Sequence, residues 1–278
     1  MKIIDGKAIA ASLREELKDK ISQLDNAPGL AVIIVGEDPA SQIYVRNKIR
    51  ACAELGIRSY SYELPQDTTQ NQLELLLDEL ALDKQVDGIL LQMPLPKHLD
   101  SDAASTHIPF EKDVDGFSSC NLGLLMQNKE EVAACTPLGV MKLLEHEGIS
   151  LEGKHAVVLG RSETVGKPMA MLLLNANATV TVCHSKTRNL KEVCAQADIL
   201  VSAVGKARFV TADMVKDGAI VIDVGINRNE EGKLCGDVDF EAVKDKTSFI
   251  TPVPGGVGPM TITMLMYNTY TRAKANKE

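Results

Sequence analysis

Apolar segments of strand length alternate with amphipathic segments of helix length through almost all of this 278-residue chain. The first half carries three strand-like runs: LAVIIV (30–35), RSYSYEL (58–64) and DGILLQ (87–92). The second half carries five: HAVVLG (155–160), ATVTVC (178–183), DILVSAV (198–204), AIVIDVG (219–225) and SFI (248–250). Helical patterns lie between them at 41–54, 69–82, 166–176 and 189–196. Strands that alternate with helices form parallel sheets with crossover helices, so we predict an α/β fold.

The length suits two domains, and the sequence places their boundary near 130–150. There the stretch TPLGVMKLLEHEGI (136–149) has the pattern of a bridging helix. We therefore predict a first domain over 1–135 and a second, Rossmann-like domain over 136–259. The last helix, within 260–278, is expected to pack back onto the first domain.

Composition and charge exclude several classes of function. The net charge of −8 provides no basic surface for nucleic acid or for an anionic membrane. The longest apolar runs are too short to span a bilayer, and the N-terminus lacks the apolar core of a signal peptide. The six cysteines have no metal-ligand spacing, which is typical of packing residues in a reducing cytosol. We expect no metal and no disulfide.

A strand, a turn and a helix start follow one another in HAVVLGRSETVGKPMAMLLL (155–174). Turns of this kind bind phosphates because the N–H groups at the helix N-terminus are unpaired. Gly160 permits the tight turn and Gly166 a close approach of strand and helix, but Ser162 replaces the second glycine of the usual motif. An ordinary strand-to-helix turn is the alternative interpretation.

The residues after the next strand bear on the choice of cofactor. NAD sites usually carry an Asp or Glu there, whereas ATVTVC is followed by His184, Ser185, Lys186 and Thr187. Hydroxyl and cationic groups suit the extra phosphate of NADP, and Arg161 could contact the same phosphate. The sequence therefore predicts NADP.

In the first half, the helical segment 41–57 carries Ser41, Tyr44 and Lys48 on one stripe. At about 100° per residue these three lie within roughly 60° of each other, on the side that we expect to be buried. Other cations of the helix lie on the opposite side. Lys48 is thus a candidate functional residue; the alternative is a lysine that extends from the edge of an apolar stripe into solvent.

Three further stretches carry polar or glycine-rich residues near expected strand ends. Gln92 ends a buried strand, where substrate groups lie in parallel sheets, although it could simply cap that strand. Asp113 and Asp115 lie in EKDVDGF (111–117), which an ordinary Asp-Gly turn would also explain. The Gly/Pro-rich loop in TPVPGGVGPMTITML (251–265) opens a helix, and we favour a ligand-facing role for it.

Seven motifs occur in order along nearly the whole chain: YVRNK (44–48), LLQMPLP (90–96), KDVDGF (112–117), GRSETVGKP (160–168), CHSKT (183–187), DVGIN (223–227) and PVPGGVGPMT (252–261). Together they resemble the bifunctional methylenetetrahydrofolate dehydrogenase/methenyltetrahydrofolate cyclohydrolase family. The resemblance implies a cytoplasmic homodimer that acts on tetrahydrofolate derivatives with NADP. It also implies two α/β domains with a cleft between them.

The resemblance assigns roles residue by residue. Lys48 would be the catalytic group, Gln92 its hydrogen-bonded neighbour and Asp115 the anchor of the pterin edge, while Tyr44 would stack on the folate ring. Further substrate contacts are implied for Ser41, Leu91, Met93, Pro254, Gly255, Gly256, Val257 and Gly258. Cofactor contacts are implied for Gly160, Arg161, Ser162, Ser185, Ile226 and Thr136.

Departures from the family pattern are few. Thr164 stands where Ile is more frequent and Met93 where Leu is usual, and Phe110 replaces a proline, with Pro109 just before it. None of these departures is at a residue assigned to chemistry. Two alternatives stay open: a dehydrogenase of the same fold without cyclohydrolase activity, and a non-catalytic nucleotide sensor. The sensor would not need the set of Lys48, Gln92 and Asp115.

Overall fold

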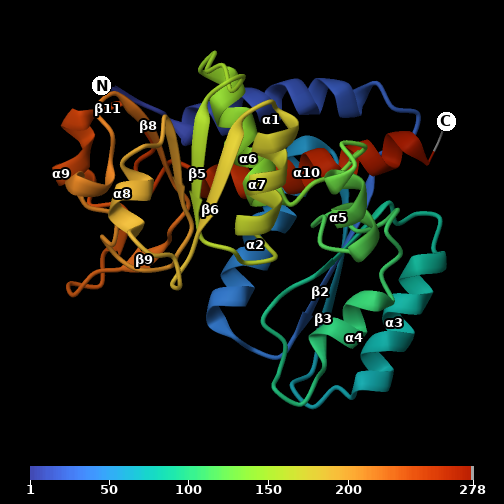
Figure 1. Cartoon of the computed structure of the whole chain (residues 1–278). Coiled ribbons are helices and arrows are strands. Elements are labelled where there is room, and N and C mark those ends of the chain that lie inside the picture. The colour runs from blue at the N-terminus through green and yellow to red at the C-terminus, as the bar shows by residue number, and fades with distance from the viewer. Residues whose placement is uncertain (277–278) are drawn as a thin grey trace. The chain divides into compact units, whose positions relative to one another are not determined.

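The computed structural model describes residues 1–276 and divides into two compact units (Figure 1). The six-strand unit comprises Met1–Ala11 and Ala134–Thr261, and the three-strand unit comprises Ser12–Ala133 and the chain from Ile262 onward. The predicted C-terminal helix is α10 (Gly258–Ala275); the last two residues of the predicted segment, 277 and 278, lie outside the described residues. Over residues 1–276, no helix combines the length and apolar character needed to cross a membrane.

The six-strand unit is built on a parallel sheet of order β1-β11-β8-β7-β5-β6. Its strands are β1 (Lys2–Ile3), β5 (His155–Leu159), β6 (Thr179–Cys183), β7 (Ile199–Ser202), β8 (Ala219–Asp223) and β11 (Thr247–Ile250). Because β1 pairs with β11, the N-terminal residues belong to this sheet. After β6 the chain passes back beyond β5 to form β7, so the strand order reverses between β5 and β7. Ligands of doubly wound sheets bind at such a switch point.

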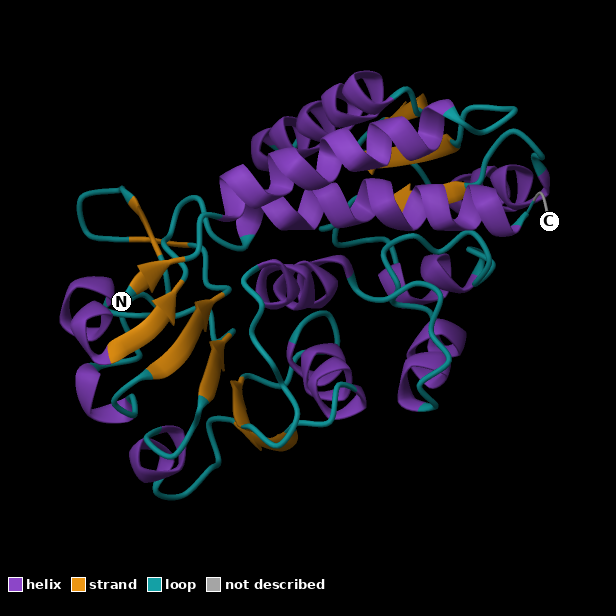
Figure 2. Ribbon diagram, turned by 90° about the horizontal axis from the view of Figure 1, so that it is seen from above, coloured by secondary structure: helices purple, strands orange, loops and turns teal. Residues whose placement is uncertain are grey.

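Helices cover both faces of this sheet, as Figures 1 and 2 show. Val157 and Leu159 point to one face and pack with the apolar residues of α8 and α9, whereas α7 packs against β5 and β6 together with α6. The helices are α6 (Cys135–His146), α7 (Gly166–Asn175), α8 (Leu190–Cys194) and α9 (Phe240–Val243), with 3₁₀ turns η1 (Ala212–Met214) and η2 (Lys244–Lys246). Burial on both faces explains why the inner strands β5, β7 and β8 are largely apolar.

The three-strand unit contains a parallel sheet of order β3-β2-β4. The strands are β2 (Gly29–Val35), β3 (Arg58–Leu64) and β4 (Gly88–Leu91). The central strand β2 is buried at every position, and its apolar side chains pack with those of α3. The helices between the N-terminus and residue 133 are α1 (Gly6–Ser22), which begins in the six-strand unit, α2 (Pro39–Leu55), α3 (Gln70–Leu82), α4 (Ser101–Thr106) and α5 (Ser119–Met126). The boundary between the units falls inside α1 and α10.

Local sequence signals set the ends of the helices that carry the site. The Asp38 carboxylate accepts a hydrogen bond from the Ser41 N–H (2.7 Å), Pro39 occupies the first turn, and Gly56 ends α2 at φ 78°. Helix α3 begins with a capping box between Thr69 and Gln72. These signals fix where α2 begins, directly after the carboxyl end of β2.

The predicted α/β fold with two parallel sheets is confirmed, and each of the eight predicted strand segments contains a strand. The sequence did not reveal the antiparallel pair β9 (Asn227–Arg228) and β10 (Leu234–Cys235), or the short helices α4, α5 and α9. These elements are too short for a hydrophobic period to be detected.

Candidate active site

Lys48 and Gln92 form a direct contact in the three-strand unit. Lys48 lies on α2, Gln92 follows β4, and the Lys48 ammonium donates a hydrogen bond to the Gln92 Oε1 atom at 2.9 Å. The Gln92 amide donates in turn to the Met93 carbonyl at 2.6 Å, which fixes the orientation of the side chain. Both residues are partly buried. The ammonium therefore has a neutral acceptor and belongs to a half-buried residue.

Asp115 lies within electrostatic reach of this pair. Its turn follows the bridge between Ile89 of β4 and Asp113, which brings the turn beside the strand that leads to Gln92. Burial raises the pKa of Asp115 to about 6; the Lys48 charge opposes this shift and the Asp113 charge adds to it. The structure thus brings together the three residues Lys48, Gln92 and Asp115 that the sequence singled out.

The stripe on α2 is only partly buried, which corrects the expectation that it faces inward as a whole. Ser41 is 3% exposed, but Tyr44 is 49% exposed. Tyr44 lies beside the buried positions of α2, Ser41 and Val45, and not among them. Among the other expected substrate contacts of this unit, Leu91 is buried and Met93 is 42% exposed.

The turn after β5 is closely packed at both of its glycines. Gly160 has φ 129°, and a Cβ atom there would lie 2.3 Å from the Ala203 carbonyl oxygen; a Cβ at Gly166 would lie 2.5 Å from the Gly160 oxygen. The Ser162 hydroxyl accepts hydrogen bonds from the N–H groups of Val165 (3.2 Å) and Gly166 (3.3 Å). The Ser162 hydroxyl thus joins the turn to the first residue of α7, a contact that the sequence did not predict.

The other expected cofactor residues lie in the same unit. Arg161 and Ser185 are exposed in the turns that follow β5 and β6, and Ile226, 57% exposed, follows β8. These turns all lie at the carboxyl edge of one sheet. Thr136 lies in the first turn of α6, where its hydroxyl is 2.9 Å from the hydroxyl of Thr261.

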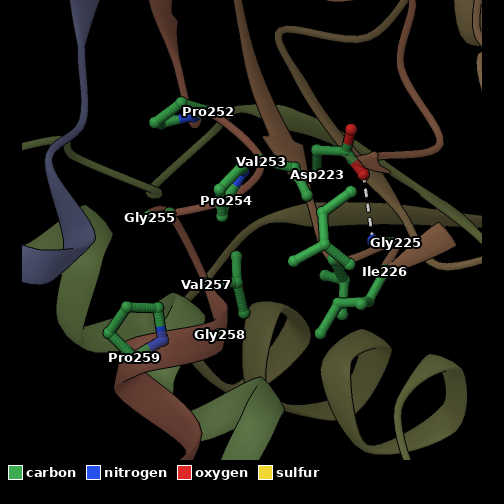
Figure 3. Close-up of a pocket in the computed structure, with 13 residues that line it drawn as sticks. Asp223, Gly225, Ile226, Pro252, Val253, Pro254, Gly255, Val257, Gly258 and Pro259 are labelled. Atoms are coloured by element: carbon green, nitrogen blue, oxygen red, sulfur yellow. Dashed lines mark hydrogen bonds between the residues drawn. The ribbon is translucent and has the colours of Figure 1, made fainter. Parts of the chain in front are cut away.

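A pocket of about 170 Å³ joins the predicted loop to the end of β8 (Figure 3). The residues that line it are Asp223, Val224, Gly225, Ile226, Leu234 and the segment 252–259. Within the segment, Gly255 has φ 102°, and its carbonyl accepts a hydrogen bond from the Lys7 N–H at 3.0 Å. A Cβ atom at Gly6 would lie 1.8 Å from the Gly256 oxygen, so the start of α1 packs tightly against the loop.

Sequence reasoning missed Asp223, Leu234 and Gly6 as neighbours of this loop. The signal for Asp223 was present, because a carboxylate interrupts the apolar run AIVID of β8. In residues 1–276, no cluster of three or more His, Cys, Asp or Glu side chains is arranged to hold a metal ion, and the six cysteines are free thiols.

Fold and site together define a class of protein. A doubly wound unit with a glycine-rich phosphate turn is joined in one chain to an α/β unit that presents a lysine, a glutamine and a carboxylate. The chain belongs to the tetrahydrofolate dehydrogenase/cyclohydrolase family: the model of its catalytic domain matches residues 4–115, and the model of its NAD(P)-binding domain matches residues 134–277.

Individual relatives agree with this assignment. The chain is 58% identical to "Bifunctional protein FolD" of Campylobacter curvus, over 99% of this chain and 96% of the relative. The crystal structure of the bifunctional enzyme FolD from Campylobacter jejuni superposes with a TM-score of 0.97 at 53% identity, over 99% of each chain. The Trypanosoma brucei enzyme, solved with NADP cofactor and inhibitor, gives a TM-score of 0.93 at 40% identity, over 99% of this chain and 98% of that one.

Proposed function

We propose that this protein oxidises 5,10-methylenetetrahydrofolate to 5,10-methenyltetrahydrofolate with NADP, and hydrolyses the product to 10-formyltetrahydrofolate. The observation that carries this proposal is the hydrogen bond from Lys48 to Gln92, with Asp115 in electrostatic reach. Family membership supplies both activities, because relatives more than half identical to the chain carry the name "bifunctional". It does not favour a dehydrogenase that lacks the cyclohydrolase step.

The residues of the six-strand unit fit a dinucleotide. The turn at Gly160 leaves room for no side chain, so a pyrophosphate could approach its backbone closely. Arg161 and Ser185 would contact the phosphates, and the turn after β6 offers hydroxyl and cationic groups in place of the carboxylate of NAD sites. When bound, NADP supplies the hydride acceptor of the dehydrogenase step.

The dehydrogenase step demands alignment rather than acid–base chemistry. The one-carbon bridge of the substrate loses a hydride, and the two bridge nitrogens stabilise the cation that remains. The protein therefore needs to bind and orient the folate. We assign stacking of the ring to Tyr44, whose side chain is open to solvent, and the anchoring of the pterin edge to Asp115.

The cyclohydrolase step requires proton transfer, because water adds to the methenyl carbon and a proton must move before the ring opens. Lys48 is the candidate for this transfer. Gln92 accepts a hydrogen bond from the ammonium through a neutral carbonyl oxygen, so it orients the Nζ atom without an ion pair. A carboxylate in the place of Gln92 would hold the proton on the lysine more strongly.

Two assays on the purified protein test the proposal. Methylenetetrahydrofolate with NADP should give the absorbance of reduced nicotinamide. Methenyltetrahydrofolate without nucleotide should lose its own absorbance through hydrolysis. If NADP is reduced but methenyltetrahydrofolate is hydrolysed only at the uncatalysed rate seen in buffer, the protein is a dehydrogenase alone. Absence of both reactions would contradict the proposal.

The choice of cofactor is tested by running the first assay with NADP and then with NAD. We expect a clear preference for NADP because of the groups that follow β6. Equal or tighter binding of NAD would contradict this part of the proposal.

We also propose that the enzyme is a cytoplasmic homodimer, with NADP bound by residues 136–259. Folate would be bound by the predicted domain of residues 1–135 with the C-terminal helix, except for Met1–Ala11, which belong to the six-strand unit. The resemblance to the family supports these points, and the scattered free cysteines suit a reducing compartment. Light scattering on the purified protein would give the mass of the assembly; a monomer mass at assay concentrations would contradict the dimer.

A further inference from the structure

Two aspartates in the six-strand unit are buried without being part of the chemistry described above. Asp223, the last residue of β8, is 3% exposed, and Asp237, which follows β10, is 0% exposed. Buried carboxylates are rare unless they are strongly hydrogen-bonded, because removal from water destabilises the charged form. Their hydrogen-bond partners therefore indicate what they hold in place.

Asp237 accepts hydrogen bonds from two separate segments. Its Oδ2 atom accepts from the N–H groups of Val204 (2.7 Å) and Gly205 (3.2 Å) and from the Ser202 hydroxyl (3.3 Å). Its Oδ1 atom accepts from the Lys206 N–H and from the side-chain amide of Asn227, both at 2.9 Å. One carboxylate thus binds the loop after β7 and, through Asn227, the segment after β8.

Asp223 binds the segment that carries Asp237. Its Oδ1 atom accepts from the N–H groups of Gly225 and Asp237, both at 2.9 Å, and its Oδ2 atom accepts from the Val238 N–H at 2.8 Å. Figure 3 shows the bond to Gly225. The two aspartates therefore form one hydrogen-bonded network that connects the ends of β7 and β8.

The backbone beside each aspartate leaves no space for a side chain. A Cβ atom at Gly225 would lie 2.2 Å from the Asp237 Oδ1 atom, and a Cβ at Gly236 would lie 1.8 Å from the Asp223 Oδ2 atom. The Asp237 carboxylate thus packs on Gly225, and the Asp223 carboxylate packs on Gly236. This close packing restricts movement of both segments.

The segments fixed in this way lie at the ends of the strands that we expect to face the cofactor. The loop 203–206 follows β7 at the switch point, and Ala203 contacts the phosphate turn at Gly160. Ile226 lies between Gly225, whose N–H is bound by Asp223, and Asn227, whose side chain is bound by Asp237. The backbone is fixed on both sides of Ile226, while its side chain stays 57% exposed.

We propose that Asp237 is a positioning residue for the cofactor: it holds the loop 203–206 and the exposed Ile226 in the arrangement that binds NADP. This inference rests on the proposed function and on the cofactor contact that the resemblance to the family implies for Ile226. Asp237 acts through these segments and touches neither substrate nor cofactor. Because hydrolysis of methenyltetrahydrofolate needs no nucleotide, loss of this positioning affects the dehydrogenase and spares the cyclohydrolase.

The variant Asp237→Asn tests the proposal, because it keeps the size of the side chain but presents an NH₂ group to N–H donors. Binding is measured by titration with NADPH and followed by the fluorescence of the nucleotide. Tryptophan fluorescence does not interfere, because the chain contains no tryptophan. We expect the NADPH dissociation constant to rise at least about tenfold, which corresponds to one buried hydrogen bond lost. Methenyl hydrolysis should stay within about twofold of the native rate. Asp245→Asn, an exposed site of the same unit, is the matched control and should change neither.

A double-mutant cycle separates positioning from a general effect on structure. The cycle compares the loss of NADPH binding free energy in the double variant Asp237→Asn/Ile226→Ala with the sum of the losses in the two single variants. If Asp237 acts through Ile226, the loss in the double variant should be clearly smaller than that sum. Asn227→Ala removes a single donor from a half-buried side chain and leaves the backbone network intact. It should weaken NADPH binding by a smaller factor, and it provides the test if Asp237→Asn does not fold.

Three results would overturn the proposal: unchanged NADPH affinity in Asp237→Asn, or in Asn227→Ala if the first variant does not fold; a parallel loss of methenyl hydrolysis in folded protein; or fully additive effects in the cycle. A native protein that bound no NADPH would give a different pattern. It would contradict the proposed function itself, and this inference with it.

Discussion

Lys48 and Gln92 are separated by 44 residues in the chain, and their side chains meet because α2 begins where β2 ends and β4 lies beside β2. At the residue scale the contact matters for its chemistry. The Lys48 ammonium meets a neutral oxygen and not a carboxylate, and the charge of Asp115 lies within electrostatic reach of it. Lys48 should therefore be required for one of the two reactions and not for the other.

We predict that Lys48→Met lowers the rate of methenyl hydrolysis by at least about 100-fold, the usual contribution of a positioned acid–base group. NADP-dependent oxidation of methylenetetrahydrofolate should remain measurable, because it needs alignment only. Both rates are followed by absorbance. Arg46→Met, which removes an exposed cation from the same helix, is the control and should retain both activities. Hydrolysis by Lys48→Met at the native rate would disprove the assigned role.

Asp115 gives a prediction about pH. Its pKa in the folded protein is about 6, above the ordinary value of 3.8, because burial disfavours the charge. The native state therefore holds this proton more tightly than the unfolded state does. Protonated Asp115 therefore contributes to the stability of the native state. This contribution is fully present below pH 3.8 and is lost as the pH rises through about 6.

We predict that Asp115→Asn gains stability relative to the native protein as the pH is raised from about 4 to about 7. Thermal unfolding of both proteins without ligands, at a series of pH values, measures the difference. Asp245→Asn, at an exposed carboxyl, should show no such trend. A constant difference between Asp115→Asn and native protein across this range would mean that the pKa of Asp115 is not raised.

At the scale of elements, the C-terminal helix α10 holds the turn that carries Asp115. The guanidinium of Arg272, 3% exposed, donates to the Phe110 carbonyl (2.9 Å) and to the Asn121 Oδ1 atom (2.7 Å). Asn121 donates to the Asp113 carboxylate at 2.9 Å, and Asp113 accepts from the Gly116 N–H at 2.9 Å. A chain of hydrogen bonds thus leads from the helix to the turn around Asp115.

We predict that Arg272→Met destabilises the protein by about 3 kcal/mol, because buried acceptors lose their donor. It should also raise the KM for methylenetetrahydrofolate, since the turn of Asp115 is less well fixed, without weakening NADPH binding. Denaturant unfolding and steady-state kinetics measure these effects. Lys18→Met, an exposed change on α1 in the same unit, should alter stability by less than about 0.5 kcal/mol. A native KM in Arg272→Met would show that the network does not position Asp115.

At the scale of the whole molecule, the two reactions depend on two compact units of one chain. The nucleotide turn lies in the six-strand unit, and Lys48, Gln92 and Asp115 lie in the three-strand unit. Under the proposed function, the dehydrogenase step needs both folate and NADP, whereas the cyclohydrolase step needs folate alone. The two activities should therefore be separable by single substitutions, one in each unit.

We predict that Gly160→Ala has the opposite effect to Lys48→Met. The added Cβ atom would lie 2.3 Å from the Ala203 oxygen at φ 129°, so the phosphate turn must distort. NADPH affinity and dehydrogenase activity should fall at least about tenfold, while methenyl hydrolysis persists. Gly123→Ala, where a Cβ meets nothing within 4 Å, is the control and should be neutral. Loss of methenyl hydrolysis in folded Gly160→Ala would show that hydrolysis depends on the nucleotide turn, contrary to this assignment.

The long elements were predictable because their signals are local. Strand runs such as 30–35 and 155–160 are apolar on both faces, and α2 and α3 carry their own caps. The sequence could not predict the β9–β10 pair, which is two residues long on each side. It also could not predict the exposure of Tyr44. The helical period gives the direction of a side chain around the helix axis, but it does not say which positions along the helix are covered by other elements.

The sequence by itself determined the class of fold, the alternation of strands and helices, and the identity of Lys48, Gln92, Asp115 and the glycine turn as candidates. The fold class and the alternation follow from hydrophobic period and local backbone requirements, which each segment carries within itself. The roles of Lys48, Gln92 and Asp115 are implied by the resemblance of seven motifs to a known family. Only the tertiary structure decided that Asp223 and Asp237 share one hydrogen-bonded network, and that Arg272 supports the turn of Asp115. Such contacts join residues distant in the chain, and they exist only once packing has brought the ends of different elements together.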